Sequence, residues 1–354
     1  MNKKLNSAYK HMAYDAQDAA VIASSNLAAG LVGITNPNGV RLDSAEDAAV
    51  FFARELDYVK AHSYDRLYPE MTALSIFPQT SEIPEGAETV TWYGYERTGM
   101  AQIINDYAND LPRADVKGQA HFSAVKSLGS SYGYSIQEMR NSMYAGKSLD
   151  ARKADSARYA IERTRNKIAW AGDKASGLVG VLSAGTGIPE FILKTTAAGK
   201  TAWKDKTADE ILEDVKLMYM YQAKLTQNVE RADTLALPSD VYIDISQRRI
   251  PDTDKTVLTY LLENAPYRTP DNNAPLKVVP APELMANSGE TNPYGVNAAV
   301  FFKNDPEKFS IETPMPYYQH PVQTKGLEME VPCEERVAGA LIYYPFSLLI
   351  IKNI

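Results

Sequence analysis

The 354-residue sequence contains a single cysteine, Cys333, and only four histidines. One thiol cannot form an intramolecular disulfide, so the chain suits a reducing compartment such as a cytoplasm. No cysteine or histidine lies at metal-ligand spacing from another, which argues against a zinc site. We therefore predict no metal site, and we expect Cys333 to be a buried or inert thiol.

A long hydrophobic run is also missing from the sequence. The first ten residues are polar, so no signal peptide is evident there. The longest apolar stretch near an end covers residues 346–351, which is far too short to span a bilayer and suits a buried strand. The sequence therefore predicts no contact with a membrane.

Motifs for catalysis are missing as well. The chain has no H-E-x-x-H motif and no G-x-S-x-G motif. Residues 180–187 resemble a phosphate loop but lack the G-K-[ST] ending, and Pro189 follows at once. We interpret this glycine-rich stretch as a linker to a second subdomain. The sequence thus predicts no catalytic residue, no cofactor and no enzyme.

Positive charge is scarce, because the formal net charge is −7. Affinity for nucleic acid depends on Lys and Arg that neutralise phosphates, so an acidic chain is a poor DNA reader. An acidic wall is still compatible with a container in which packed DNA does not stick. The 22 tyrosines leave two readings open, since tyrosine serves cores and is also enriched at subunit contacts.

The first half of the chain predicts an arm, a helix and a long extended excursion. Residues 1–50 are poor in large apolar groups, so they need a partner to dock on, either their own domain or a neighbouring subunit. Ser44 begins a predicted helix with an apolar stripe. Residues 84–134 favour two strands with a charged tip between them. A lone two-stranded ribbon is marginal in water, so we expect another surface to cover it.

Helices follow the excursion. Ser135 and Glu138 fit a capping box, and a long helix is predicted from about Ser148 to Asp173. Its apolar seam should run through Ala157, Ile161, Thr164, Ile168 and Ala171, and about 26 residues would span about 39 Å.

The remainder of the chain mixes short elements. Thr207 and Glu210 form a second predicted capping box ahead of an amphipathic helix. The other predicted elements are strands at residues 235–237, 276–279, 298–302 and 342–351, and short helices at 238–246 and 257–262. With no βαβ repetition, the fold class is α+β.

This order of parts resembles the Hong Kong 97 fold of the major capsid proteins of tailed bacteriophages (Caudovirales). The residues that carry the resemblance are FARELDYV at 52–59, PEGAET at 84–89, GMAQI at 99–103, LPRADV at 111–116, YGYSIQE at 132–138, LDARKA at 149–154 and VPAPEL at 279–284. The resemblance covers roughly residues 50–354, and it is specific because many separated motifs occur in the right order.

The resemblance implies a division into named parts. They are an N-terminal arm and first helix at 1–65, a P-domain strand at 66–83, an E-loop at 84–131, a P-domain with a spine helix at 132–200, an A-domain at 201–325, and return strands to the P-domain at 326–354.

The resemblance also implies a self-assembling structural subunit of an icosahedral virion capsid that encloses double-stranded DNA without reading its sequence. Its partners would be itself, in pentamers and hexamers, together with a scaffolding protein, a portal and a decoration protein, with assembly in the host bacterial cytoplasm. Some relatives cross-link an E-loop lysine, but neither Lys117 nor Lys126 matches a cross-linking motif. The candidate intersubunit contacts are Arg54, Glu55, Arg97, Asp106, Asp110, Arg113, Lys117, Arg158 and Arg163.

Three other interpretations compete with this one. An encapsulin-type nanocompartment shell protein would share the fold, and cargo enzymes would replace its DNA. A tail or decoration protein would not need a long helix after a long loop. An unrecognised α+β hydrolase would need a pocket of convergent titratable groups. If the shell interpretation holds, deleting residues 85–125 should leave a folded core that cannot assemble.

Overall fold

A computed structural model of the chain describes residues 68–103, 111–145, 151–196, 199–264 and 276–354. Residues Tyr68–Ile354 form one compact unit of mixed helices and sheets. The predicted arm and the helix that begins at Ser44 lie outside the described residues.

Five strands form one sheet in the order β5-β14-β8-β6-β7. Their bounds are Glu190–Phe191 for β5, Thr234–Leu237 for β6, Lys277–Pro280 for β7, Ala298–Phe302 for β8 and Leu348–Lys352 for β14. Strands β6 and β8 are buried along their whole length, as expected for a sheet that is covered on both faces. Successive residues join different clusters, with Phe301 in one core and Val300 and Phe302 in the other.

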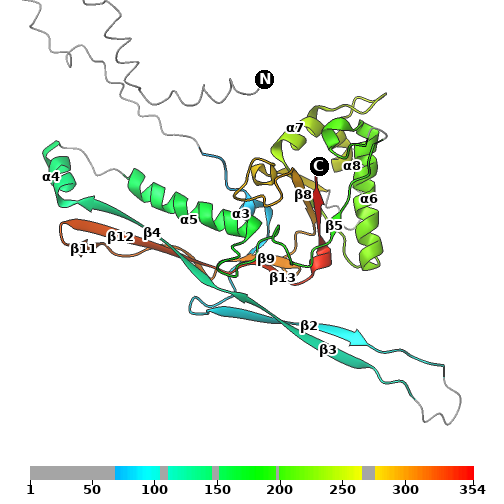
Figure 1. Ribbon diagram of the computed structural model, residues 1–354, viewed down its shortest axis with the longest axis horizontal. Helices are drawn as coiled ribbons and strands as arrows, with labels where there is room; N and C mark the ends of the chain where they lie inside the picture. Colours follow the sequence, from blue (N-terminus) through cyan, green and yellow to red (C-terminus); the bar gives the residue numbers. More distant parts are fainter. Residues whose placement is uncertain (1–67, 104–110, 146–150, 197–198, 265–275) are drawn as a thin grey trace, which may run out of the picture. The chain divides into compact units, whose positions relative to one another are not determined.

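Three helices pack against the Phe301 side of this sheet (Figure 1). They are α6 at Ala208–Thr226, α7 at Ser239–Gln247 and α8 at Val257–Glu263, preceded by the 3-10 turn η2 at Trp203–Asp205. The capping box of α6 is confirmed, because Thr207 and Glu210 exchange hydrogen bonds between side chain and backbone. The short helices and strands predicted in this part of the chain are confirmed to within a residue or two.

The second core lies under α3, Ala73–Ile76, and the end of α5, Arg152–Ala171. Buried Glu283, in the 3-10 turn η3 at Pro282–Leu284, accepts the Thr72 N–H at 2.8 Å and the Asn166 Nδ2–H at 2.9 Å. This carboxylate therefore joins three segments that are far apart in the sequence, which gives the VPAPEL motif a structural role.

The long helix α5 packs on a four-stranded sheet. Its strands are β4 at Lys126–Ser135, β10 at Met315–Gln319, β11 at Gln323–Lys325 and β12 at Glu328–Val337. The predicted seam is wrong at Thr164, which is exposed, because the partly buried Arg165 faces the sheet in its place. Arg165 can face the sheet since its guanidinium pairs with Glu335, which is fully buried on β12.

The helix begins at Arg152 and ends at Ala171, so its 20 described residues span about 30 Å. The predicted residues 148–150 lie outside the described residues, and the end comes two residues earlier than expected. The helix α4, Ile136–Ala145, precedes it. Its predicted capping box forms with one change. Glu138 accepts the Ser135 N–H at 3.1 Å, as in a capping box, but Ser135 Oγ accepts the Gln137 N–H, also at 3.1 Å, where a capping box would use the Glu138 N–H.

Two sequence interpretations are corrected by this part of the fold. The strand predicted at 342–351 is two strands, β13 at Gly339–Ile342 and β14, because the 3-10 turn η4 at Pro345–Ser347 separates them. Strand β13 instead joins β9, Phe309–Glu312, and β1, Gln79–Thr80.

The glycine-rich stretch is not a loose linker. Val181 and Leu182 are fully buried, and a Cβ on Gly180 would stand 2.6 Å from the Ile168 oxygen at the end of α5. The glycine is needed there for close backbone approach, and Val181 and Leu182 belong to the second core.

Two ten-residue strands, β2 at Thr89–Thr98 and β3 at Asp115–Ala124, form an antiparallel sheet of their own (Figure 1). The predicted two-stranded excursion is confirmed for residues 89–124. Its predicted end at residue 134 is wrong, because residues 126–135 form β4 in the four-stranded sheet, and Asp115 and Lys117, which were expected in the charged section between the strands, belong to β3. We call this pair of strands the ribbon.

Candidate assembly surface

The root of the ribbon is fastened by an arginine from β12. Arg336 donates from Nη1 to the Glu85 carbonyl oxygen and from Nη2 to the Ala87 carbonyl oxygen, the latter at 3.0 Å. The Val125 N–H donates to the Glu88 oxygen at 2.8 Å and closes the root. The PEGAET motif is thus the turn that Arg336 binds. These contacts orient the ribbon relative to β12.

One face of the ribbon is apolar and uncovered by any described residue. Opposite residues of an antiparallel pair share a face, so the register puts Thr91 with Phe122, Tyr93 with Ala120, Tyr95 with Gly118 and Arg97 with Val116. Phe122 is 81% exposed, Tyr95 is 73% exposed and Tyr93 is 64% exposed. We call the residues Thr91, Tyr93, Tyr95, Val116 and Phe122 the outer ribbon face.

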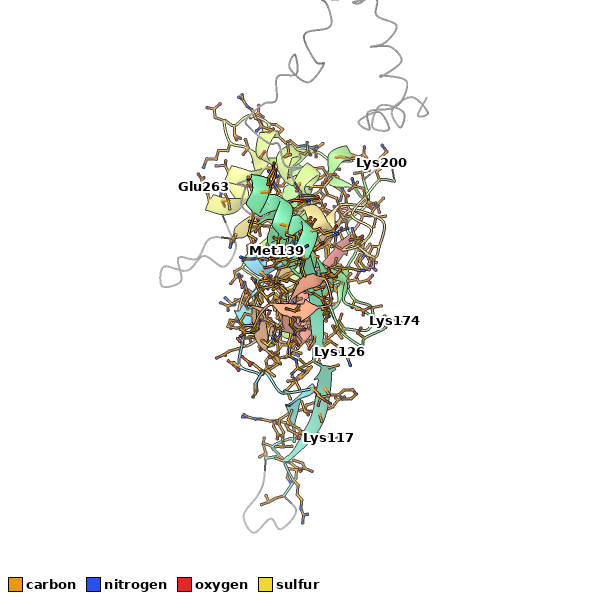
Figure 2. The ribbon with its side chains drawn as sticks, turned by 90° about the vertical axis from the view of Figure 1, so that its left-hand side faces the viewer. Lys117, Lys126, Met139, Lys174, Lys200 and Glu263 are labelled. Carbon is orange, nitrogen blue, oxygen red and sulfur yellow. The ribbon has the colours of Figure 1, made fainter. Side chains whose placement is uncertain are left out.

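The opposite face turns towards the rest of the compact unit. Trp92 stacks on His121 with ring centroids 5.6 Å apart and meets Tyr343 edge-on at 5.6 Å. Further along, Glu96 lies opposite Lys117 in the register. Figure 2 shows Lys117 far out on the ribbon, with Lys126 where the chain passes into β4. The ribbon therefore has one anchored face and one free aromatic face.

The described tyrosines lie mostly at the surface or at the edges of the cores. Among the described tyrosines only Tyr219 is buried, while Tyr144, Tyr318 and Tyr344 are more than half exposed. Tyr132, Tyr242, Tyr294 and Tyr317 pack against the cores while the exposed rings are free for contacts, so both readings of the composition stay open.

Two of the motifs meet at the start of α5. The Lys153 ammonium donates to the Gly133 oxygen at 3.0 Å, pairs with Glu138 at 3.0 Å and lies 4.7 Å from the centre of the Tyr134 ring. These contacts bring the pKa of the exposed Glu138 carboxyl below its usual range, since the ammonium and the Ser135 N–H favour the charged form. LDARKA and YGYSIQE thus form one joint between α4, β4 and α5.

The candidate contact residues fall into three groups. Arg97, Arg113 and Lys117 are exposed on the ribbon or at its tip. Arg158 pairs with Glu162 at 2.8 Å and Arg163 with Glu290 at 2.7 Å within the subunit. These pairs do not test contacts between subunits, so that assignment stays a prediction. The remaining candidates, which lie outside the described residues, are Arg54, Glu55, Asp106 and Asp110.

The described part of the chain offers neither a metal-binding group nor a membrane-spanning helix. It holds no group of three or more His, Cys, Asp or Glu side chains that could bind a metal ion. None of its helices has the length and apolar character needed to cross a bilayer. Cys333 is buried, as expected, and its sulfur accepts a hydrogen bond from the Tyr317 hydroxyl at 3.1 Å.

The Major capsid protein family matches residues 99–354 of this chain, which is more than half of its length. The chain belongs to the major capsid protein family, and it is a structural capsid subunit rather than an enzyme. The resemblance to tailed-phage capsid proteins and the Hong Kong 97-like α+β fold are confirmed. Self-association into a virion capsid follows from this membership.

Solved structures from phages and related particles share this fold. The capsid of Myoviridae Phage XM1 superposes with a TM-score of 0.71 at 16% identity, covering 86% of this chain and 99% of that one. The capsid of the empty GTA particle gives 0.57 at 13% identity, covering 88% and 99%. Mycobacterium phage Adephagia gives 0.55 at 11% identity, covering 87% and 97%. No curated protein matches the chain.

Sequence reasoning missed the residues that now stand out most. The outer ribbon face could have been found, because an alternating aromatic pattern at Tyr93 and Tyr95 already marks one side of a strand. Arg336 carries no such signal, since its partners are backbone oxygens some 250 positions away along the chain.

Proposed function

We propose that the chain forms the icosahedral head of a tailed bacteriophage, with its ribbon lying over an adjacent subunit in pentamers and hexamers. The observation that carries this proposal is the outer ribbon face, whose three aromatic rings are exposed without cover from the described residues of the same chain.

The physical argument rests on stability and symmetry. A two-stranded ribbon is marginal by itself, and contiguous exposed aromatic residues mark contact sites. Closed rings of identical subunits use heterologous contacts, in which a projection from one copy meets a different surface on the next. A ribbon fastened at its root by Arg336 and free along its length is suited to be that projection.

The remaining expectations belong to the same proposal. The net charge of −7 suits a wall that encloses DNA without sequence-specific binding. Scaffolding, portal and decoration proteins are proposed partners, and the host bacterial cytoplasm is the proposed site of assembly. The six-part division from arm to return strands and the nine candidate contact residues also stay proposals. Membership of the major capsid protein family favours a phage head over an encapsulin-type shell.

The test is a variant in which residues 91–122 are replaced by an Asn-Gly turn between Val90 and Ser123, which are opposite each other in the register. It keeps Arg336, its carbonyl partners and buried Val125, so the compact unit should still fold. We expect a folded subunit that forms no shell in electron microscopy. Shells of normal size and yield would refute the role of the ribbon.

A further inference from the structure

The long helix α5 rests on β12 through two small apolar clusters with an ion pair between them. One cluster includes Cys333 and the other includes Val337, and each also holds apolar residues of α5. Glu335 lies between those two positions on β12, and its carboxylate pairs with Arg165 of α5. We call the Arg165–Glu335 contact the buried pair. A change in its charge acts at the middle of the contact between helix and strand.

Glu335 is a carboxyl group in an otherwise apolar row. Alternate residues of β12 are buried, and the other buried positions are Val331, Cys333 and Val337. The Glu335 side chain is 0% exposed, and that of Arg165 is 18% exposed. The carboxylate has therefore lost its hydration, and its charge depends on the groups that the protein places beside it.

The buried pair is incompletely hydrogen-bonded. Arg165 Nη1 donates to Glu335 Oε1, whereas Glu335 Oε2 and Arg165 Nε are buried and have no hydrogen-bond partner among the described residues. Arginine can donate to both oxygens of a carboxylate at once, and such a two-point pair is stronger than this one-point pair. The second oxygen of Glu335 can therefore take a proton without breaking the hydrogen bond at the first.

In the described part of the chain, no cation other than Arg165 pairs with Glu335. Also on α5, Glu162 pairs with Arg158 at 2.8 Å, and these two charges act on Glu335 in opposite directions. The titratable groups nearby on the strands are exposed or bond to other groups. They are Lys126 and Tyr132 on β4, Tyr317 on β10, and Cys333, Glu334 and Arg336 on β12. The charge of Glu335 is thus balanced by one guanidinium alone.

The surroundings of Glu335 determine when it binds a proton. Burial raises the pKa of the Glu335 carboxyl, and the Arg165 guanidinium opposes that rise. The folded chain therefore binds this proton more tightly than the unfolded chain, in which the pKa of glutamate is about 4.3. The resulting stability is complete below that unfolded value and is lost as the pH rises through the folded pKa.

We propose that Glu335 is a proton-binding site that makes the seat of α5 on β12 sensitive to pH. At neutral pH the helix rests on a buried charge that has one hydrogen bond. In mild acid Glu335 is neutral, and the contact between α5 and β12 becomes more stable. Arg165 keeps access to water through its exposed fraction, so it needs no other anion. The site belongs to the folded subunit and is independent of the ribbon and of assembly.

Hydrogen exchange measured by mass spectrometry tests the site in the full-length subunit. Relative to the intrinsic rate at each pH, exchange in residues 161–170 of α5 should slow severalfold between about pH 7 and about pH 5. Glu335→Gln has a similar volume and no proton to bind, so its exchange there should be the same at both pH values. Glu328→Gln, exposed on the same strand, is the matched control and should respond as the unaltered chain does.

Two outcomes of this measurement would overturn the proposal. One is exchange in α5 of the unaltered chain that does not slow in acid. The other is a Glu335→Gln variant that slows as much as the unaltered chain, because the response would then come from another group.

Arg165→Met gives a second test with a larger effect of the same sign. It leaves the carboxylate buried without its cation, so Glu335 should bind its proton still more tightly. Exchange in α5 should therefore slow more on acidification than in the unaltered chain. If the variant is unfolded at neutral pH, circular dichroism should show that acid restores the fold. A response no larger than that of the unaltered chain, or no recovery of an unfolded variant in acid, would overturn the proposal.

Discussion

At the scale of single residues, Asp214 shows how the fold holds a buried charge. It lies on α6 with 1% of its side chain exposed, and it accepts hydrogen bonds from Lys206 at 2.5 Å and from the Trp203 indole at 3.0 Å. Burial raises the pKa of the Asp214 carboxyl, and the two hydrogen bonds oppose that rise. The pair fixes the η2 turn against the start of α6.

Lys206→Met should therefore destabilise the subunit by about 3–5 kcal/mol, because it leaves a buried carboxylate without its cation. Denaturant unfolding of the variant measures this loss. The double variant with Asp214→Asn serves as the control and should recover part of the stability, since a neutral amide needs no cation and its oxygen can still accept the Trp203 indole N–H. A single variant as stable as the unaltered chain would contradict this account.

The pH dependence of the Lys206→Met variant follows from the same pair. Without the ammonium, the pKa of Asp214 in the folded state rises further above the unfolded value of about 3.9. The folded state then binds the proton more tightly than the unfolded chain. The stability of the variant should be greatest below that unfolded value and should fall as the pH rises through the folded pKa. An unfolding free energy independent of pH between 4 and 7 would contradict this.

Arg336 is a second single residue with a structural role, because it fixes the orientation of the ribbon. Arg336→Gln removes the two donors that hold Glu85 and Ala87, and we expect a loss of about 1–2 kcal/mol at the ribbon root. Hydrogen exchange should quicken at the Val125 amide, while the five-stranded sheet stays protected. Arg249→Gln, on an exposed arginine elsewhere, is the control. Equal exchange in both variants would show that Arg336 does not hold the ribbon.

At the scale of elements, the two faces of the ribbon differ: one contacts the compact unit through Trp92, and the other exposes aromatic rings. The variant Tyr93→Ser with Tyr95→Ser alters two exposed rings of the outer ribbon face, so the unfolding free energy should change by less than about 0.5 kcal/mol. Particle formation should nevertheless fall sharply, because those rings would be buried at the contact. Sedimentation separates assembled particles from free subunits and measures the amount of each. Normal particles from this variant would place the contact elsewhere.

The elements also show where sequence patterns succeed and fail. Periodicity and caps predicted α6, α7, β6 and β8 well, because local chemistry such as the Thr207–Glu210 pair determines those ends. The pattern failed at Thr164, because the neighbouring Arg165, partly buried, faces the sheet instead and pairs with Glu335, 170 positions away in the sequence. It failed at Gly180 too, whose tight approach to the end of α5 exists only after folding.

The candidate site was predictable only in part. The motifs identified the excursion and its charged residues, and the ribbon confirms the excursion. The free aromatic face depends on the cross-strand register, and the clamp by Arg336 depends on contacts between distant segments. The alternation of Tyr93 and Tyr95 marks one side of β2 in the sequence, but Phe122 joins that side only through the register, and the Arg336 contacts exist only after folding.

At the scale of the whole molecule, the charge at the outer end of the ribbon should affect assembly independently of the aromatic rings. Arg113→Glu with Lys117→Glu reverses two exposed cations and should weaken assembly modestly, since exposed ion pairs contribute little individually. The effect should shrink as the salt concentration rises, because screening removes it. Light scattering at two ionic strengths measures this. Assembly unchanged at low salt would remove these residues from the contact.

The central claim is that this chain is a subunit that assembles with itself. The most direct measurement is negative-stain electron microscopy with size-exclusion chromatography of the protein expressed alone and together with its neighbouring genes. The account predicts closed shells, or rings of five and six subunits. A compact monomer under both conditions would contradict it.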